Sequence, residues 1–367
     1  MPDAEVTVYE AGPKALAKVA VTGGGRCNLT NSFEHVGSLS EVYPRGLRVM
    51  QRALKRFSNE DTMEWFEREG VALTVQEDGC VFPVSQDAMQ IVRTLERLMR
   101  TLDVKLVLNR RVESLDGLDA DAVVVTTGGG VPAFLVGLGL EIVPPVPSLY
   151  TFRVNNPGLK SLMGTVVQDA ALSIPGTAFR SRGALLVTDW GLSGPAALRL
   201  SSYAARHLAE HGFRAPLLVN WTGGSEEEAR SWISAAAARE KGRLVTSVHP
   251  DGITARLWEH LLRRAGIRPD LRWAEMGSKG ANRLANTLVA DSYGIDGRTR
   301  FREEFVTCGG VSLAAVDLNT LESRDRPGLY FAGEVLDIDA VTGGFNLQAA
   351  WSTGYMVAES IFNKTKI

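Results

Sequence analysis

Residues 330–354, which read YFAGEVLDIDAVTGGFNLQAAWSTG, constrain the fold of this chain more than any other segment. A short apolar stretch leads into Gly333 and Glu334, an acidic loop follows, and a pair of glycines, Gly343 and Gly344, precedes a helix-like run. Glycine lets another group approach the backbone where a Cβ would collide with it. The segment therefore predicts a strand, a glycine loop and a helix, with room for a ligand at the loop.

The expected helix begins near Asn346. Free N–H groups and the positive end of the helix dipole favour an electron-rich ligand that gains negative charge. A reduced flavin ring is such a ligand, because its charge collects at the N1 and C2 carbonyl edge. An ordinary strand–loop–helix unit with a glycine turn explains the same spacing, so both interpretations stay open.

Two further glycine loops lie elsewhere in the chain. Residues 22–32, TGGGRCNLTNS, combine three consecutive glycines with the fixed charge of Arg26 and with short polar side chains such as Asn28. This composition favours an anion or cofactor loop over a simple polar turn. Residues 128–130 are all glycine and follow the apolar run 121–126. That run predicts a strand buried on both faces, and ligands in open α/β sheets collect at the carboxyl ends of such strands.

The composition excludes several classes of protein. A net charge of −2 gives no electrostatic argument for binding nucleic acid or an anionic membrane. The three cysteines lie far apart, which argues against a zinc site or a disulfide framework and fits a cytoplasmic protein. No apolar run approaches the ~20 residues of a membrane span, and the N-terminus does not read as a signal peptide. The histidines are scattered, so no metal site is expected.

The chain of 367 residues is long enough for more than one domain. Prolines at positions 144, 145 and 147 mark a change in composition. We predict a first α/β part over residues 1–145, an inserted domain over 146–305 with a helical part near 225–275, and a return to the first domain over 306–367.

Periodicity and turn residues predict the individual elements. In the first part we expect a helix that Ser85 caps. In the inserted domain we expect Ser193 to cap a helix that begins in the run GLSGP. The other expected helices cover residues 48–57, 62–69, 226–239 and 253–265. The expected strands cover residues 5–9, 104–108, 111–115, 121–126, 150–154, 165–172, 184–188 and 217–221.

Four runs of sequence together resemble one family. They are TGGGRCNLTNS at 22–32, GLSGPA at 191–196, VTCGGVSLAAVDLNTLES at 306–323 and PGLYFAGEVLDIDAVTGGFNLQAAWSTG at 327–354. The chain resembles, over nearly its whole length, the bacterial FAD-binding flavoproteins that include aminoacetone oxidase-like and 3-dehydro-bile-acid reductase-like enzymes. The resemblance implies an α/β fold: a FAD-binding two-dinucleotide-type domain with an inserted β-barrel plus a helical subdomain.

The resemblance also implies which residues bind FAD. Those it places at the cofactor are Glu10, Lys18, Gly24, Gly25, Arg26, Cys27, Asn28, Val112, Gly128, Gly129, Gly333, Glu334, Asp337, Gly344, Phe345, Asn346 and Leu347. Glu10 is expected at the adenosine ribose and the backbone of Val112 at the adenine. Lys18 and residues 24–28 are expected near the phosphates and the flavin. Cys27 is expected to contribute packing more than redox chemistry.

The remaining roles follow the same resemblance. Residues 128 and 129 are expected at the pyrophosphate. Gly333, Glu334 and Asp337 are expected at the ribityl-phosphate region, and residues 344–347 along the edge of the flavin ring. No residue is predicted to be a catalytic acid or base, and no metal ligand is predicted.

Three departures from the family pattern accompany the resemblance. The family carries a strand and a GxGxxG turn about 25 residues before the equivalent of Lys18, and the printed sequence starts at what matches the second strand. The loop after Thr126 is shorter than usual. Asp189 and Trp190 stand where a histidine often occurs. We therefore expect the chain as printed to bind FAD less tightly than its relatives do.

We predict a FAD-dependent oxidoreductase that transfers hydride between flavin N5 and a small organic substrate, with NAD(P)H as a candidate electron donor. One alternative is an N-terminally truncated remnant without cofactor or activity. A weaker alternative is a flavin-dependent RNA-modifying enzyme, against which the neutral charge counts. We expect no nucleic acid or membrane partner, and the oligomeric state is not predicted.

Overall fold

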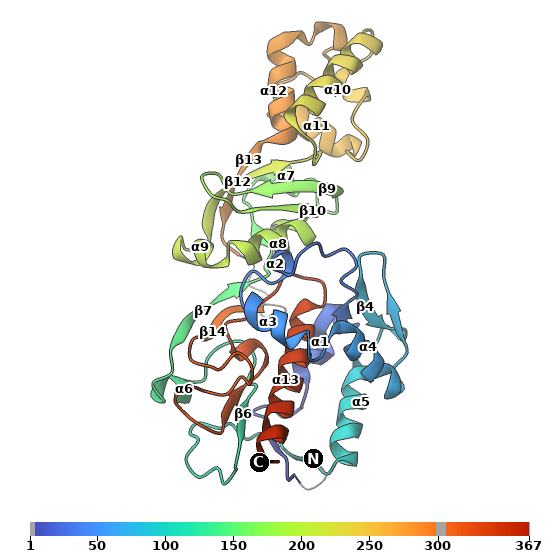
Figure 1. The fold of residues 1–367 in the computed structure, drawn as a ribbon. Coiled ribbons are helices and arrows are strands. Elements are labelled where there is room, and N and C mark those ends of the chain that lie inside the picture. The colour runs from blue at the N-terminus through green and yellow to red at the C-terminus, as the bar shows by residue number, and fades with distance from the viewer. Residues whose placement is uncertain (1–3, 299–305, 367) are drawn as a thin grey trace. The chain divides into compact units, whose positions relative to one another are not determined.

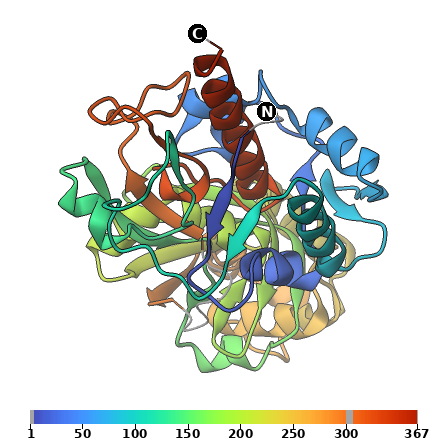
Figure 2. The ribbon, with the colours of Figure 1, turned by 90° about the horizontal axis from the view of Figure 1, so that it is seen from below.

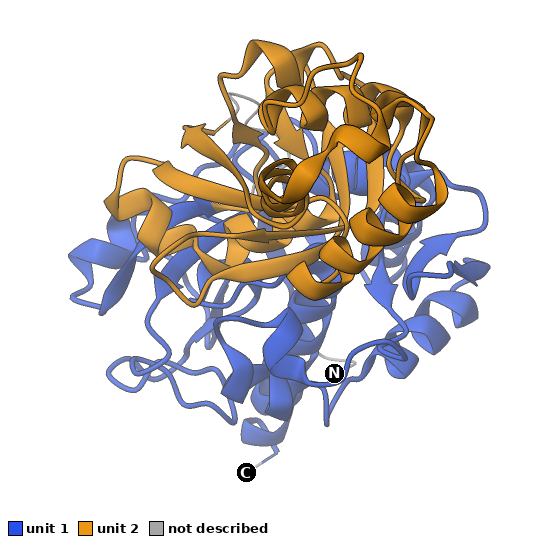
Figure 3. Ribbon diagram, turned by 90° about the horizontal axis from the view of Figure 1, so that it is seen from above, with its two compact units in different colours: residues 1–147, 302–367 blue, residues 148–301 orange. Residues whose placement is uncertain are grey.

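The computed structural model describes residues 4–298 and 306–366. The chain divides into two compact units, one made of Met1–Pro147 and Arg302–Ile367 and the other of Ser148–Phe301 (Figure 3). The first unit is therefore discontinuous in sequence, and the second is inserted into it. Figure 1 gives the element labels.

The first unit contains two pairs of parallel strands. β1 (Thr7–Tyr9) pairs with β5 (Lys105–Val107), as Figure 2 shows from below, and β6 (Val123–Val125) pairs with β15 (Leu329–Phe331). Among the described residues each of these four strands has a single strand neighbour. Val8 and Val124 are consequently 38% and 39% exposed. The predicted strand at 121–126 exists, but its expected burial on both faces is wrong.

The other strands of this unit form a three-stranded antiparallel sheet and a separate pair. The sheet has the order β2-β4-β3, and the pair is β14-β7. Their bounds are β2 (Thr30–Asn31), β3 (Leu73–Val75), β4 (Cys80–Pro83), β7 (Ile142–Ser148) and β14 (Val306–Val311).

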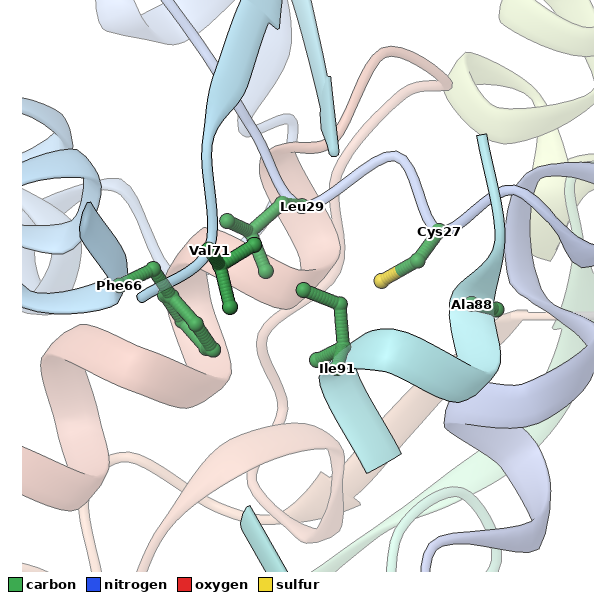
Figure 4. Packing of buried hydrophobic residues seen from close by; sticks show 6 residues of the cluster. All are labelled: Cys27, Leu29, Phe66, Val71, Ala88 and Ile91. Atoms are coloured by element: carbon green, nitrogen blue, oxygen red, sulfur yellow. The ribbon is translucent and has the colours of Figure 1, made fainter. Parts of the chain in front are cut away.

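Helices surround these strands, and the long helix α13 (Phe345–Lys364) packs against α3 and β2 (Figure 1). All six residues of one buried cluster of this unit come from loops, α4 and α5 (Figure 4). The remaining helices are α1 (Ala17–Gly25), α2 (Leu39–Val42), α3 (Leu47–Ala53), α4 (Asn59–Arg68), α5 (Ala88–Thr101), α6 (Ala133–Gly137) and the 3₁₀ turn η3 (Gly333–Val335).

Two local predictions in the first unit are wrong. Asp87, not Ser85, caps α5, because its carboxylate accepts from the N–H of Met89 at 2.9 Å. Residues 111–115 form no strand. Their charged side chains are exposed, and the Ser114 hydroxyl accepts from the N–H of Asp116, so a local turn competes with strand pairing.

The second unit contains one antiparallel sheet of six strands in the order β13-β12-β9-β10-β11-β8. A bridge links Phe152 of the last strand to Arg298, which follows the first strand of this order, so the sheet is nearly closed into a barrel. This agrees with the expected inserted barrel. The strands are β8 (Phe152–Arg153), β9 (Val166–Ser173), β10 (Arg180–Val187), β11 (Gly191–Ser193), β12 (Arg214–Asn220) and β13 (Asp291–Asp296).

Tryptophan side chains pack together between helices of the second unit. Trp232 contacts Trp258 and Trp273 edge to face. The prediction that Ser193 caps α8 is wrong: Ser193 belongs to β11, and Gly194, with φ 90°, takes the cap position. The helices are α7 (Pro157–Lys160), α8 (Pro195–Tyr203), α9 (Ala205–Glu210), α10 (Glu226–Arg239), η1 (Val245–Ser247), α11 (Ala255–Arg264), η2 (Trp273–Glu275) and α12 (Gly277–Val289).

Within the described ranges, no helix combines the length and apolarity that crossing a membrane would need. The same ranges contain no cluster of three or more His, Cys, Asp or Glu side chains that could hold a metal ion.

Candidate functional site

The start of α13 is a helix N-terminus without a side-chain cap. Its first turn carries the N–H groups of Phe345, Asn346 and Leu347, which have no partner within the helix. The Asn346 side chain bonds both the N–H and the carbonyl of Ala340, at 2.9 and 3.0 Å. Asn346 therefore holds the preceding loop with its side chain and can offer a ligand only its backbone.

The loop at 28–31 holds the glycine turn before α13. In the amide orientation that satisfies both partners, Asn28 accepts from the N–H of Gly344 at 3.2 Å and donates to the carbonyl of Thr30 at 3.0 Å. Asn31 donates to the carbonyl of Gly343 at 3.0 Å. The structure thus brings predicted site residues from opposite ends of the sequence, Asn28 and Gly344, into contact.

The glycines of this turn are required by the protein itself. A Cβ on Gly344 would lie 2.2 Å from the carbonyl oxygen of Thr30, and the φ of Gly344 is 88°. A Cβ on Gly343 would lie 2.8 Å from the ring of Phe345. The sequence-based argument that these glycines make room for a ligand is therefore incomplete, because the contacts they permit are between protein segments.

Gly24 and Gly25 behave differently. Both have positive φ, and a Cβ on either would meet no atom within 4 Å. The helix α1 is interrupted at Thr22, Gly23 and Gly24, so the predicted glycine loop is confirmed. The guanidinium of Arg26 lies 4.5 Å from the ring centroid of Phe82 and donates to the carbonyl of Gly23. This loop presents open backbone beside a fixed positive charge.

Cys27 is fully buried in the apolar cluster that Figure 4 shows, together with Leu29 and Ile91. Leu347 of α13 packs against the same cluster. Burial raises the pKa of the Cys27 thiol to about 11, partly offset by a hydrogen bond with Thr22. Cys27 is therefore a packing residue with an unreactive thiol.

Glu334 connects a second group of predicted site residues. Its carboxylate accepts from the N–H of Gly129 at 3.0 Å and from Lys18 Nζ at 3.4 Å. It also accepts from the N–H of Thr307 at 2.7 Å. Gly333, beside it, donates its N–H to the Thr353 hydroxyl at 2.9 Å, which ties this loop to α13.

The remaining predicted residues lie at the ends of strands. Glu10 follows β1, and its carboxylate accepts from the N–H of Gly12 at 2.6 Å. The N–H of Arg110 donates to the Glu10 carbonyl, which brings the half-buried Val112 segment near this strand end. Asp337 bonds Val311 through its backbone N–H. No described hydrogen bond joins Glu10 or Val112 to the other two groups.

Sequence reasoning missed several contacts that shape the site. Thr307 acts through its main-chain N–H, and the Thr30 hydroxyl donates to Gln348, whose amide donates to Ser352. The buried carboxylate of Asp339 forms a bidentate ion pair with the guanidinium of Arg45. Backbone donors leave no signal in a sequence. The carboxylate of Asp339 does stand in the acidic loop, but its partner lies 294 positions away.

The described residues fit the flavin end of FAD. The uncapped start of α13 and the open backbone of Gly24 and Gly25 offer N–H groups and space to a flat, electron-rich ring. Lys18 and the turn at 128–130 offer charge and backbone to a phosphate. Only one carboxylate oxygen of Glu10 accepts a hydrogen bond from the described residues, and a ribose hydroxyl could use the other.

Comparison with known proteins places these features in context. The family model described as HI0933-like protein Rossmann domain matches residues 1–360. A ribosomal RNA dihydrouridine synthase of Escherichia coli (strain K12) is 28% identical over 382 residues, covering 97% of this chain and 92% of that protein.

Two other relatives are similar to the same extent. A 3-dehydro-bile acid delta(4,6)-reductase of Clostridium scindens is 27% identical over 387 residues, covering 98% of this chain and 93% of that protein. A ribosomal RNA dihydrouridine synthase of Haemophilus influenzae is 28% identical over 385 residues, covering 97% and 92%.

Proposed function

This chain belongs to the family described as HI0933-like protein Rossmann domain, and from that premise we propose that it is a FAD-dependent oxidoreductase. The observation that carries the proposal is the uncapped start of α13, held by Asn28 and Asn31 beside the open glycine loop of α1. Backbone N–H groups fixed in this way suit a ring that gains negative charge on reduction.

When bound, reduced FAD supplies a hydride from its N5 atom, and a proton completes the reduction of the substrate. The residues of this chain bind and orient. The first turn of α13 would face the N1 and C2 edge of the ring, Gly24 and Gly25 would line its side, and Lys18 would contact a phosphate. NAD(P)H is the proposed source of electrons.

The substrate we propose is a small organic molecule with a carbon–carbon double bond. The names of the relatives point to this chemistry, since one describes a delta(4,6)-reductase of a bile acid and the other a synthase of dihydrouridine, a uridine with two added hydrogens. The common reaction is the addition of a hydride to one carbon and a proton to the next, while the flavin is oxidised.

A second candidate is the reduction of uridine in RNA. Two relatives named as ribosomal RNA dihydrouridine synthases align with 97% of this chain, which favours this candidate. The net charge of −2 counts against a large RNA contact. Incubation of the reduced protein with ribosomal RNA, followed by mass spectrometry of nucleosides, separates the two, because only the second candidate produces dihydrouridine.

The first test is flavin binding. The purified chain is titrated with FAD. We expect saturable binding, with flavin absorbance retained after gel filtration. If the chain is folded and retains no FAD, the proposed function is wrong.

A further inference from the structure

The helix α12 of the second unit starts without a side-chain cap. It follows η2 across Met276, which has right-handed helical angles, and Gly277, whose φ is 61°. A right-handed residue followed by a left-handed one turns successive N–H groups toward one side, where they form a concave site for anions. The N–H groups of Gly277 and Ser278 have no acceptor within the helix or on a described side chain. The start of α12 therefore offers free donors.

A cavity of about 380 Å³ lies at this helix start. It is formed where α10 packs against α12 and η2 (Figure 1). Gly277 and Ser278 line it together with the apolar side chains of Ile233, Ala237 and Ala281. Sites for small ligands have such volumes and are mostly apolar with a few placed polar groups. The cavity can therefore hold an apolar body beside the free donors of α12.

A buried donor without an acceptor borders the same cavity. Trp273 of η2 lines the cavity, and its side chain is buried. Its indole N–H has no acceptor among the described residues, whereas the indole of buried Trp258 donates to the carbonyl of Val245 at 2.8 Å. Burial of an unsatisfied donor costs free energy, so buried indole N–H groups usually have a partner. An oxygen atom of a ligand in this cavity would be such a partner.

Positive charge reaches the cavity from Lys241, whose residue is exposed and lines it. The carbonyl of Lys241 accepts from the N–H of Ala274 at 3.2 Å, which fixes this segment beside η2. No described carboxylate pairs with the Lys241 ammonium, because the nearby Glu240 pairs with Arg239 and Arg243. None of the described residues that line the cavity is acidic. The charge of Lys241 is therefore available to an anion.

We propose that this cavity binds a small organic oxyanion, that is, a carboxylate or phosphate group on a short apolar body. The first N–H groups of α12, the indole N–H of Trp273 and the ammonium of Lys241 hold the oxyanion. The apolar wall holds the body. The site belongs to the second unit alone, and the inference does not rest on the proposed flavin function.

Calorimetric titration of the full chain with hexyl phosphate and with hexanoate tests the proposal. We expect saturable binding of at least one of them, because each joins an oxyanion to an apolar chain, and the tighter of the two identifies the head group. Hexanol lacks the charge and inorganic phosphate lacks the chain. Each of these two should bind at least about tenfold more weakly than the tighter ligand.

Substitutions at Ser278 separate loss of the site from loss of the fold. Ser278→Asp places a carboxylate in the first turn of α12, where it interacts favourably with the helix dipole and repels a bound anion. It should raise the unfolding temperature and weaken binding more than about tenfold, a combination that a misfolded variant cannot give. Ser278→Ala keeps both N–H groups and should leave the dissociation constant within about threefold.

The role of Lys241 is tested against a matched lysine. Lys241→Met should weaken binding about fivefold. Lys279→Met changes the net charge equally, at an exposed lysine of the first turn of α12 that does not line the cavity. It should alter the dissociation constant by less than about twofold.

The indole N–H of Trp273 gives a direct signal in proton–nitrogen NMR spectra of the labelled chain. The indole resonance that disappears in Trp273→Phe should move downfield when the ligand binds, because the N–H gains an acceptor. The inference is overturned if neither hexyl phosphate nor hexanoate binds, or if hexanol binds equally well. Equal weakening by Lys241→Met and Lys279→Met, or a Trp273 resonance that stays in place at saturation, would also overturn it. None of these outcomes bears on FAD binding.

Discussion

At the scale of single residues, the structure separates glycines that serve the protein from glycines that leave open space. Gly344 belongs to the first kind, since a Cβ there would lie only 2.2 Å from the carbonyl oxygen of Thr30. Gly24 belongs to the second kind. The sequence marks both as glycine and cannot distinguish them, because the atoms that surround Gly344 come from residues more than 300 positions away. This is why the glycine loops were predictable and their physical reasons were not.

Replacement of Gly344 by alanine tests the turn before α13. A φ of 88° costs a residue with a Cβ roughly 1–2 kcal/mol, and the contact with Thr30 adds to this cost. We expect Gly344→Ala to lower the free energy of unfolding and to weaken FAD binding at least about tenfold. Gly354→Ala is the control, since Gly354 lies inside α13 with no atom within 4 Å of its Cβ position, and it should stabilise the protein slightly. Equal effects of the two substitutions would contradict the account.

The thiol of Cys27 gives a second prediction. Its pKa of about 11 and its complete burial keep it protonated and inaccessible at neutral pH. Alkylation of the native protein with iodoacetamide, followed by peptide mass spectrometry, should leave Cys27 unmodified, whereas alkylation in denaturant should modify it fully. Rapid labelling in the native state would show that this loop is open to solvent.

The pH dependence of stability should reflect His260. Burial lowers the pKa of His260, Arg264 and Arg263 lower it further, and only Asp291 opposes them. The unfolded chain then binds a proton near pH ~6.5 that the folded chain does not bind. Stability should therefore fall as the pH drops through that value.

The measurement is the free energy of unfolding by urea as a function of pH. The slope between pH ~7.5 and ~5.5 should decrease in His260→Asn and persist in His35→Asn, where the histidine is exposed. An unchanged slope in His260→Asn would show that other groups produce the pH dependence.

At the scale of elements, long periodic helices were predictable. Short strands and the identity of the residue that caps a helix were predicted less well. Residues 226–239 are helical as predicted, because a capping box of Ser225 and Glu228 sets the start of α10. The cap of α5 was misplaced, since Ser85 and Asp87 are both good cap residues and only the backbone shows which one meets Met89. The predicted strand at 111–115 failed because alternation of apolar residues cannot reveal whether a partner strand is present.

The cap of α5 can be tested directly. Asp87→Ala should lower the free energy of unfolding by about 1 kcal/mol, because the N–H of Met89 loses its acceptor. Ser85→Ala is the matched control and should change it by less than ~0.5 kcal/mol. Urea unfolding of both variants measures the difference. A larger decrease in the free energy of unfolding for Ser85→Ala than for Asp87→Ala would show that Ser85 caps α5, as the sequence alone suggested.

At the scale of the whole molecule, four long runs of sequence indicated the family, and the family model matches residues 1–360. The α/β unit interrupted by a six-stranded antiparallel sheet agrees with the predicted fold. The roles of individual site residues stay predictions, because the contacts that define them join distant segments such as Asn28 with Gly344 and Lys18 with Glu334. Spacing within one segment carries no record of such contacts.

Ligand binding to the native state also predicts a change in stability. FAD at about 100 times its dissociation constant should raise the free energy of unfolding by ~2.7 kcal/mol, if it binds the folded chain alone. The unfolding temperature should therefore rise with FAD concentration. Adenosine, which lacks the flavin and the phosphates, is the control and should raise it far less.

The most direct test of the central claim is a titration of FAD against the folded native protein and the Gly344→Ala variant, followed by flavin fluorescence. The account predicts saturable binding of one FAD per native chain and a much weaker affinity in the variant. Folded native protein that binds no FAD, or a variant that binds it as tightly as the native chain, would contradict the claim that the turn before α13 holds a flavin.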